Sequence, residues 1–247
     1  MKYKEQAGAV MNRHYINASL ELHNWKKKMR KKPSIINRAS KGVQNRINGM
    51  LPKKYHQILT SAIKNMVKVV LTGSEYMSKR PDLFMTFEER ERLVREKIDF
   101  YKKTAMLEGA GTGAGGLLLG LADLPLLLSI KIKFLYDVAS IYGFDVKDYK
   151  ERLYILKIFQ LAFSSQAVVN KVFNEMENWE EYSKHLPSSL ELFNWREFQQ
   201  EYRDYIDIAK LLQLVPGIGA VVGAYANAKL MDKLGVTAMN AYRMRIL

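Results

Sequence analysis

The side chains with the types needed for metal binding or proton transfer are few and scattered in this sequence. The four histidines stand apart, and none belongs to an H-E-x-x-H or comparable ligand pattern: His14, His23, His56 and His185. The chain has no cysteine, which excludes thiolate ligands, cysteine nucleophiles and disulfides. It also has no G-x-S-x-G nucleophile motif and no G-x-x-x-x-G-K-[ST] phosphate loop. The sequence therefore predicts no metal site, no cofactor and no catalytic residue.

Carboxylates gather in two places, but their surroundings favour a structural use. Both clusters fall on helix-forming segments with Arg and Lys nearby, so we expect exposed, solvated ion pairs for Glu88, Glu89 and Glu91 and for Glu175, Glu177, Glu180 and Glu181. An enzyme that acts on a lipid or a peptide is the alternative. Its site would be assembled in three dimensions around Asp123, Tyr142 and Asp145.

Three glycines match a dinucleotide-binding fingerprint by spacing alone. Gly111, Gly113 and Gly116 satisfy G-x-G-x-x-G, and Asp137 follows 21 residues after the last of them. The fingerprint binds pyrophosphate only where a β-strand leads into the glycine turn and a helix leaves it. The preceding segment, IDFYKKTAMLE, is charged and has helical periodicity. We therefore do not predict a nucleotide site.

Glycines also recur four residues apart in two apolar stretches, 109–130 and 211–228. The first has Asp123 as its one charge and the second has none, and the spaced pairs are Gly109/Gly113, Gly111/Gly115, Gly116/Gly120 and Gly219/Gly223. On a helix such a pair clears one face and lets another helix approach closely. We therefore expect two glycine-rich apolar helical segments in close packing. An irregular glycine loop at 109–116 is the alternative.

Partial insertion of the first stretch into a membrane is a further alternative. The uncharged run 109–122 has 14 residues, which is short of the roughly 20 that a spanning helix needs. Its length therefore argues against a span.

Excess positive charge is confined to the first part of the chain. Residues 1–70 hold 16 Lys and Arg against 2 Asp and Glu, whereas residues 71–247 hold 23 of each. Such an excess suits a polyanion, either an anionic lipid surface or a nucleic acid. The densest part, which we name the basic cluster and expect to bind an anionic surface, consists of Trp25, Lys26, Lys27, Lys28, Arg30, Lys31 and Lys32.

An apolar helical stripe runs up to the basic cluster and ends before Pro33. Its members are Met11, Tyr15, Ala18, Leu22, Trp25 and Met29. Packing onto the rest of the protein and lying on a bilayer both need such a stripe. We favour packing of the stripe onto the protein, and the lysines could still face a membrane in that arrangement. Trp25 beside the lysines has the position of an interfacial anchor. Nucleic-acid binding is the alternative, although no recognition fold is legible.

Local capping signals mark two helices in the middle of the chain. Thr86 and Glu89 form a capping box that opens a charged helix from Phe87 to about residue 108. Asp123 followed by Pro125 in the first turn predicts a second helix that runs to residue 142, where Gly143 stops it.

Helical periodicity continues through the other segments. We expect helices at 58–72, 145–163, 166–185, 190–214, 218–234 and 236–247, with Gly235 as a stop between the last two. No alternating run demands a sheet. We therefore predict an all-α, multi-helix globular bundle, with a basic N-terminal helical region at 1–70 and an all-helical domain at 71–247.

One combination of these motifs resembles the EcsC family of bacterial proteins. It spans about residues 105–230 and consists of Gly111, Gly113, Gly116 and Gly120, Asp123-Leu124-Pro125, Ala139, Tyr142-Gly143-x-Asp145, and Pro216-x-x-Gly219-x-x-x-Gly223-x-x-x-Asn227. The resemblance implies no established activity and supplies no catalytic residue. Family members are typically encoded beside the subunits of an ABC-type transporter, which implies an accessory role at the cytoplasmic face of the membrane.

Charge, apolar segments and resemblance together predict a non-enzymatic cytoplasmic accessory protein that lies peripherally on the inner face of the cell membrane. Its expected partners are the anionic membrane surface, subunits of an ABC-type transporter and an apolar ligand, rather than nucleic acid. The first residues, MKYKEQAGAVMNRHY, lack the apolar run of a signal peptide, so we expect the N-terminus on the cytoplasmic side.

Overall fold

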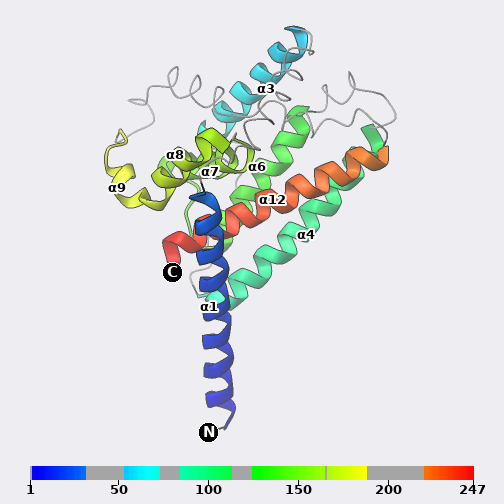
Figure 1. Ribbon diagram of the computed structural model, residues 1–247. Helices are drawn as coiled ribbons and strands as arrows, with labels where there is room; N and C mark the ends of the chain where they lie inside the picture. Colours follow the sequence, from blue (N-terminus) through cyan, green and yellow to red (C-terminus); the bar gives the residue numbers. More distant parts are fainter. Residues whose placement is uncertain (1, 32–52, 73–83, 113–123, 165, 188–219) are drawn as a thin grey trace.

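The computed structural model describes residues 2–31, 53–72, 84–112, 124–164, 166–187 and 220–247, and their regular elements are α-helices (Figure 1). These helices are α1 (Lys2–Met29), α3 (Lys53–Thr72), α4 (Phe87–Thr112), α6 (Leu124–Ile141), α7 (Tyr149–Phe163), α8 (Gln166–Glu177), α9 (Trp179–Lys184) and α12 (Ala220–Ile246). The all-α prediction is confirmed. The helix predicted at 190–214 lies outside the described residues.

Helices α4 and α12 form an antiparallel pair along most of their lengths (Figure 1). A Cβ on Gly235 of α12 would lie 2.7 Å from Cγ1 of Ile98 on α4, so glycine is needed for this close approach. The predicted stop at Gly235 is wrong, because α12 continues through it. Contact with α4 here outweighs the roughly 1 kcal/mol that glycine costs inside a helix.

The start of α4 follows the predicted capping box. The backbone N–H of Thr86 donates to Oε2 of Glu89 at 2.8 Å, and the N–H of Glu89 donates to Oγ1 of Thr86 at 3.3 Å. Val94 and Ala105 on this helix are buried, whereas Met106 is exposed. The helix also extends past residue 108 to Thr112, farther than predicted.

The end of α6 is set by Gly143, as predicted. Its φ of +96° belongs to the left-handed region. The N–H of Phe144 donates to the Ala139 carbonyl at 3.0 Å and the N–H of Gly143 to the Ser140 carbonyl at 3.0 Å, which is the Schellman pattern. Nη1 of Arg90 also donates to the Ile141 carbonyl at 2.7 Å, so α4 covers this helix end.

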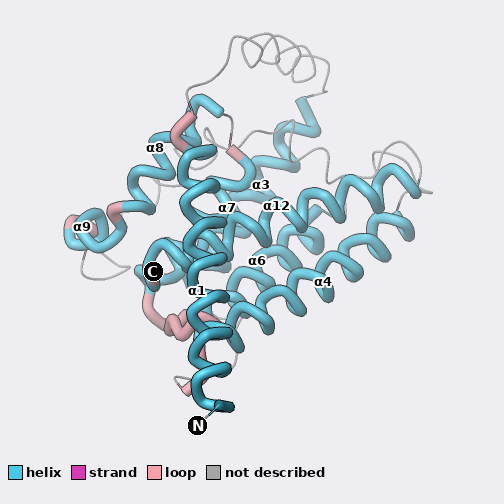
Figure 2. Tube along the Cα trace, turned by 60° about the horizontal axis from the view of Figure 1, so that its bottom comes forward, coloured by secondary structure: helices cyan, strands magenta, loops and turns pink. Residues whose placement is uncertain are grey.

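Other helix boundaries also differ from the prediction, and α3 begins at Lys53 rather than at residue 58. Helix α7 begins at Tyr149, because Asp148 accepts from the N–H of Lys150 at 2.9 Å and acts as its N-cap, while Asp145 belongs to the preceding turn. The helix predicted for 166–185 is divided at Asn178, whose backbone leaves the helical region, and α9 turns away from α8 (Figure 2).

One apolar core joins the described helices. It contains, among others, Trp25 of α1, Ile63 of α3, Phe134 of α6, Phe159 of α7, Phe173 of α8 and Met231 of α12. Residues of the basic N-terminal region thus contribute to the same core as residues after 71. Among the described helices, no segment is both long enough and apolar enough to cross a bilayer.

Candidate functional site

The inner face of α1 packs on the rest of the protein. Ala18, Leu22 and Trp25 are buried, and the Trp25 ring meets the edge of Phe173 on α8 with 5.7 Å between the ring centroids. Helix α1 crosses the C-terminal part of α12, and its N-terminal half extends away from the other helices (Figures 1 and 2). The apolar stripe is therefore a packing surface, and it continues to Tyr15, whose ring meets the edge of Phe87, and to Met29, which packs partly buried against the core.

Two cations of the basic cluster bind a carboxylate within the protein. Nη2 of Arg30 lies 2.6 Å and Nζ of Lys26 lies 3.2 Å from the same oxygen, Oε1 of Glu177 at the end of α8. Burial raises the pKa of Glu177, but the hydrogen bonds and charges of Arg30 and Lys26 outweigh burial and bring this pKa below its ordinary value. These contacts fix the end of α1 on α8.

Lysines of the basic cluster also lie on the opposite, solvent side of α1. Lys27, Lys28 and Lys31 are exposed, while Lys32 lies outside the described residues. Spacings of four and seven residues place Ile16, Leu20 and Lys27 on one helix face, which we call the outer face of α1, and Lys31 follows two residues after the end of this helix. Ile16 is 50% and Leu20 is 57% exposed. The outer face therefore combines exposed apolar side chains with positive charge.

A buried ion-pair network lies beneath α1, and we call it the Glu91 network. Glu91 of α4 accepts three hydrogen bonds. Its Oε2 accepts from Nη2 of Arg243 at 2.6 Å. Its Oε1 accepts from Nε of Arg243 at 2.9 Å and from the Tyr142 hydroxyl at 2.6 Å. Nη1 of Arg243 donates to Glu21 of α1 at 2.8 Å, and Arg95 lies 3.5 Å from the same Glu21 oxygen. The network therefore joins α1, α4, α12 and the end of α6.

The sequence prediction for Glu91 is wrong, because this side chain is fully buried rather than exposed. Its main partner, Arg243, lies 152 residues away, so no local pattern could reveal the pair. Burial and the Glu91 carboxylate raise the pKa of Tyr142 well above its ordinary value. Tyr142 thus stays protonated and donates its hydrogen bond, which gives this predicted site residue a role in positioning helices.

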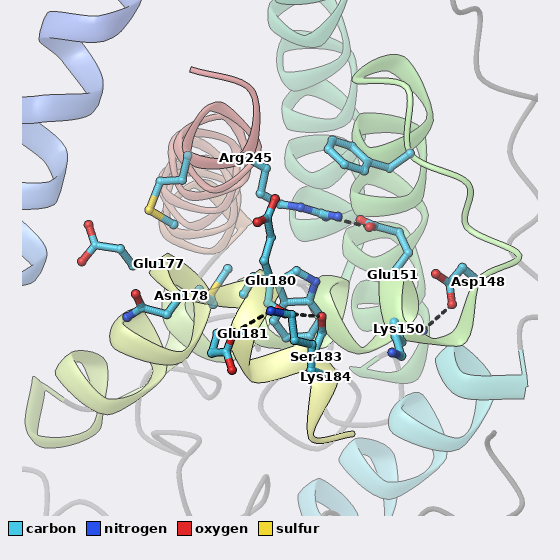
Figure 3. Close-up of a pocket in the computed structure, with 14 residues that line it drawn as sticks. Asp148, Lys150, Glu151, Glu177, Asn178, Glu180, Glu181, Ser183, Lys184 and Arg245 are labelled. Atoms are coloured by element: carbon cyan, nitrogen blue, oxygen red, sulfur yellow. Dashed lines mark hydrogen bonds and ion pairs between the residues drawn. The ribbon is translucent and has the colours of Figure 1, made fainter. Parts of the chain in front are cut away.

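A pocket of about 560 Å³ lies between the start of α7, the α8–α9 turn and the end of α12 (Figure 3). Nη1 of Arg245 binds Oε2 of Glu151 at 2.6 Å on its inner wall, and the guanidinium lies 3.8 Å from the centre of the Phe144 ring. The other charged lining residues are Asp148, Lys150, Glu177, Glu180, Glu181 and Lys184. A lining this polar does not suit an apolar ligand.

The remaining predicted site residues are dispersed or lie outside the described part. Pro125 is exposed in the first turn of α6, Asp145 is exposed and accepts from the N–H of Lys147, and Asn227 is buried on α12. Gly111 belongs to the end of α4 and Gly223 to the start of α12. Outside the described residues are Gly113, Gly116, Gly120, Asp123, Pro216 and Gly219. Close packing of the two glycine-rich stretches stays a prediction.

The buried carboxylates among the described residues contact side chains of other helices. The described residues contain no group of three or more His, Asp or Glu side chains that could hold a metal ion. Their buried carboxylates, Glu91 and Glu151, have both oxygens occupied by Arg and Tyr donors. These carboxylates therefore hold helices together rather than face a substrate.

Comparisons with known proteins agree with the resemblance and extend it. The sequence model of the EcsC protein family matches residues 17–247, which include α1 from Asn17 onward. Protein EcsC of Bacillus subtilis (strain 168) is 46% identical over 228 residues, which cover 92% of this chain and 94% of the relative. The uncharacterized protein YdbA of the same organism is 26% identical over 219 residues, 81% of this chain and 80% of the relative. No solved structure matches.

Proposed function

The chain belongs to the EcsC family, and we propose that it is an accessory protein that binds peripherally to the anionic inner surface of the cell membrane through the outer face of α1. The observation that carries this proposal is the placement of exposed Ile16 and Leu20 on the same helix face as exposed Lys27, with exposed Lys31 just after the end of this helix. Lys28, also exposed, flanks this face.

Magnitudes support binding by the two kinds of side chain together. A Lys near an anionic surface contributes about 1 kcal/mol. Burial of a Leu or Ile side chain contributes about 1.5–3 kcal/mol when it is complete, and less at an interface. Either contribution alone gives weak, reversible attachment, whereas their sum on one helix supports stable but salt-sensitive binding.

The apolar residues favour a lipid surface over nucleic acid as the polyanion. Phosphate groups of either partner would suit the lysines. Only a bilayer interface also offers an apolar environment to Ile16 and Leu20. A protein held at the membrane in this way would lie beside the membrane subunits of an ABC-type transporter, the partner that the family resemblance implies.

Flotation with lipid vesicles tests the proposal. We expect the protein to float with vesicles that contain an anionic phospholipid at low salt, and to remain unbound with phosphatidylcholine alone or at high salt. The variant K27Q/K28Q/K31Q is expected to lose at least about ten-fold in affinity, from the ~1 kcal/mol that each lysine contributes.

The matched control is K64Q/K68Q/K103Q, which removes three exposed lysines on α3 and α4. It keeps the same net charge as the α1 variant and should float nearly as well as the wild type. Absence of binding by the wild type, or equal losses in the two triple variants, would overturn the proposal. So would binding of a DNA fragment through Lys27, Lys28 and Lys31 with no binding to vesicles.

A further inference from the structure

The surface binding proposed above leaves two cations of the basic cluster without a role. Lys26 and Arg30 lie in the same two helical turns as the exposed lysines, but both contact Glu177. On that basis we propose that Glu177 is an internal competitor for Lys26 and Arg30, so that tight binding requires a surface of high enough negative charge to draw these cations away from it.

The geometry of the contact suits such an exchange. A single carboxylate oxygen of Glu177 contacts both cations. The Arg30 side chain is 57% exposed, whereas the Glu177 side chain is only 18% exposed. Phosphate groups can therefore reach the Arg30 guanidinium while α1 stays packed. Glu177 itself is largely covered and cannot follow the cations to a surface.

The packing of α1 also rests on contacts that involve neither Lys26 nor Arg30. Trp25 packs against Phe173, and Glu21 accepts a hydrogen bond from Arg243. Ion pairs at partly exposed positions contribute little to stability, and a surface of many phosphates offers each cation more than one anionic neighbour. Exchange from Glu177 to the surface thus costs little structure.

The proposal makes Glu177 a residue that sets the charge density at which the protein binds. With Glu177 present, Lys27, Lys28 and Lys31 act first, and Lys26 and Arg30 join only on strongly anionic membranes. Without the Glu177 charge, all five cations are available at once.

A double-mutant cycle on vesicles with graded anionic lipid content tests this competition. Glu177→Gln is expected to bind about five-fold tighter than the wild type, and to need less anionic lipid for half-maximal binding. In the K26Q/R30Q background the same substitution is expected to give little gain, because the cations that it would release are absent.

Glu180→Gln is the matched control. Glu180 is exposed on α9, lines the same pocket, and its removal changes the net charge equally. Its small effect should be the same in both backgrounds. Circular dichroism and thermal unfolding of each variant would show that α1 remains folded and packed.

The outcomes separate this inference from the proposed function. If the wild type does not float with anionic vesicles, the proposed function is overturned and the inference with it. If the wild type floats through Lys27, Lys28 and Lys31 but Glu177→Gln binds no better than Glu180→Gln, or gains equally in both backgrounds, only the competition is overturned.

Discussion

Arg243 of α12 binds both oxygens of Glu91 on α4, with Nη2 to Oε2 at 2.6 Å and Nε to Oε1 at 2.9 Å, and both side chains are almost completely buried. A paired charge in such a place can be tolerated, but a single one cannot. The contact therefore has a larger consequence for stability than ion pairs on the surface.

Arg243→Met is expected to lower the free energy of unfolding by about 3–5 kcal/mol, because the buried Glu91 carboxylate loses its bidentate partner and keeps only the half-exposed Arg95 at 3.6 Å. Urea unfolding measures this loss. Arg92→Gln, which removes an exposed pair with Glu96, should cost at most about 1 kcal/mol. The double variant R243M/E91M should recover part of the loss, and a double variant less stable than R243M would contradict the explanation.

Gly235→Ala is expected to destabilise the protein by about 1–3 kcal/mol through overpacking. The added methyl would lie 2.7 Å from Cγ1 of Ile98, so α4 and α12 would have to separate. Thermal unfolding measures the effect. In an Ile98→Ala background, Gly235→Ala should lower the free energy of unfolding by less than it does in the wild type. Stabilisation by Gly235→Ala alone would show that helix propensity, not contact with α4, dominates here.

The attachment of α1 should weaken in acid. For Glu21 and Glu177, burial raises the pKa, but the arginines and Lys26 that contact them lower it more, so that each pKa lies below its ordinary value. A lowered pKa means that each carboxylate contributes stability above its unfolded pKa, and that this contribution disappears as pH falls through the folded pKa. The difference in unfolding free energy between the wild type and E21Q/E177Q should therefore be constant near neutral pH and shrink below about pH 4.5. A difference that persists in strong acid would contradict this assignment.

Trp25 and Leu20 should have separable effects, because they lie on opposite faces of α1. Trp25→Phe is expected to reduce stability by about 1 kcal/mol, since the ring against Phe173 becomes smaller. Its binding to anionic vesicles should not change. Leu20→Ser is expected to leave stability nearly unchanged and to weaken vesicle binding. The reverse pattern would make Trp25 the membrane anchor and remove Leu20 from that role.

Sequence reasoning succeeded where the signal was local. The Thr86 and Glu89 capping box and the stop at Gly143 depend on residues within a few positions of one another, and both are found as predicted. The same local rule failed at Gly235, because contact with Ile98 of another helix decided the outcome. At the start of α7, two aspartates three residues apart were both suitable caps, and periodicity could not choose Asp148 over Asp145.

In the candidate site too, local features could be predicted from the sequence, whereas contacts between distant residues could not. Composition identified the basic cluster, but the distinction between occupied and available cations depends on Glu177, 147 residues after Arg30. The Glu91 network likewise depends on partners from four separate helices. Neither arrangement has a signature in the spacing of neighbouring residues.

The Glu91 network also constrains the order in which the chain can assemble during synthesis. Glu91 leaves the ribosome long before Arg243, and until that arginine emerges its nearest cation is Arg95, which lies 3.6 Å away and is half exposed, so burial of the carboxylate is unfavourable. Helix α4, which packs chiefly against α12, therefore reaches its final position only after α12 has been synthesised. The last helix to appear is the one that completes the fold.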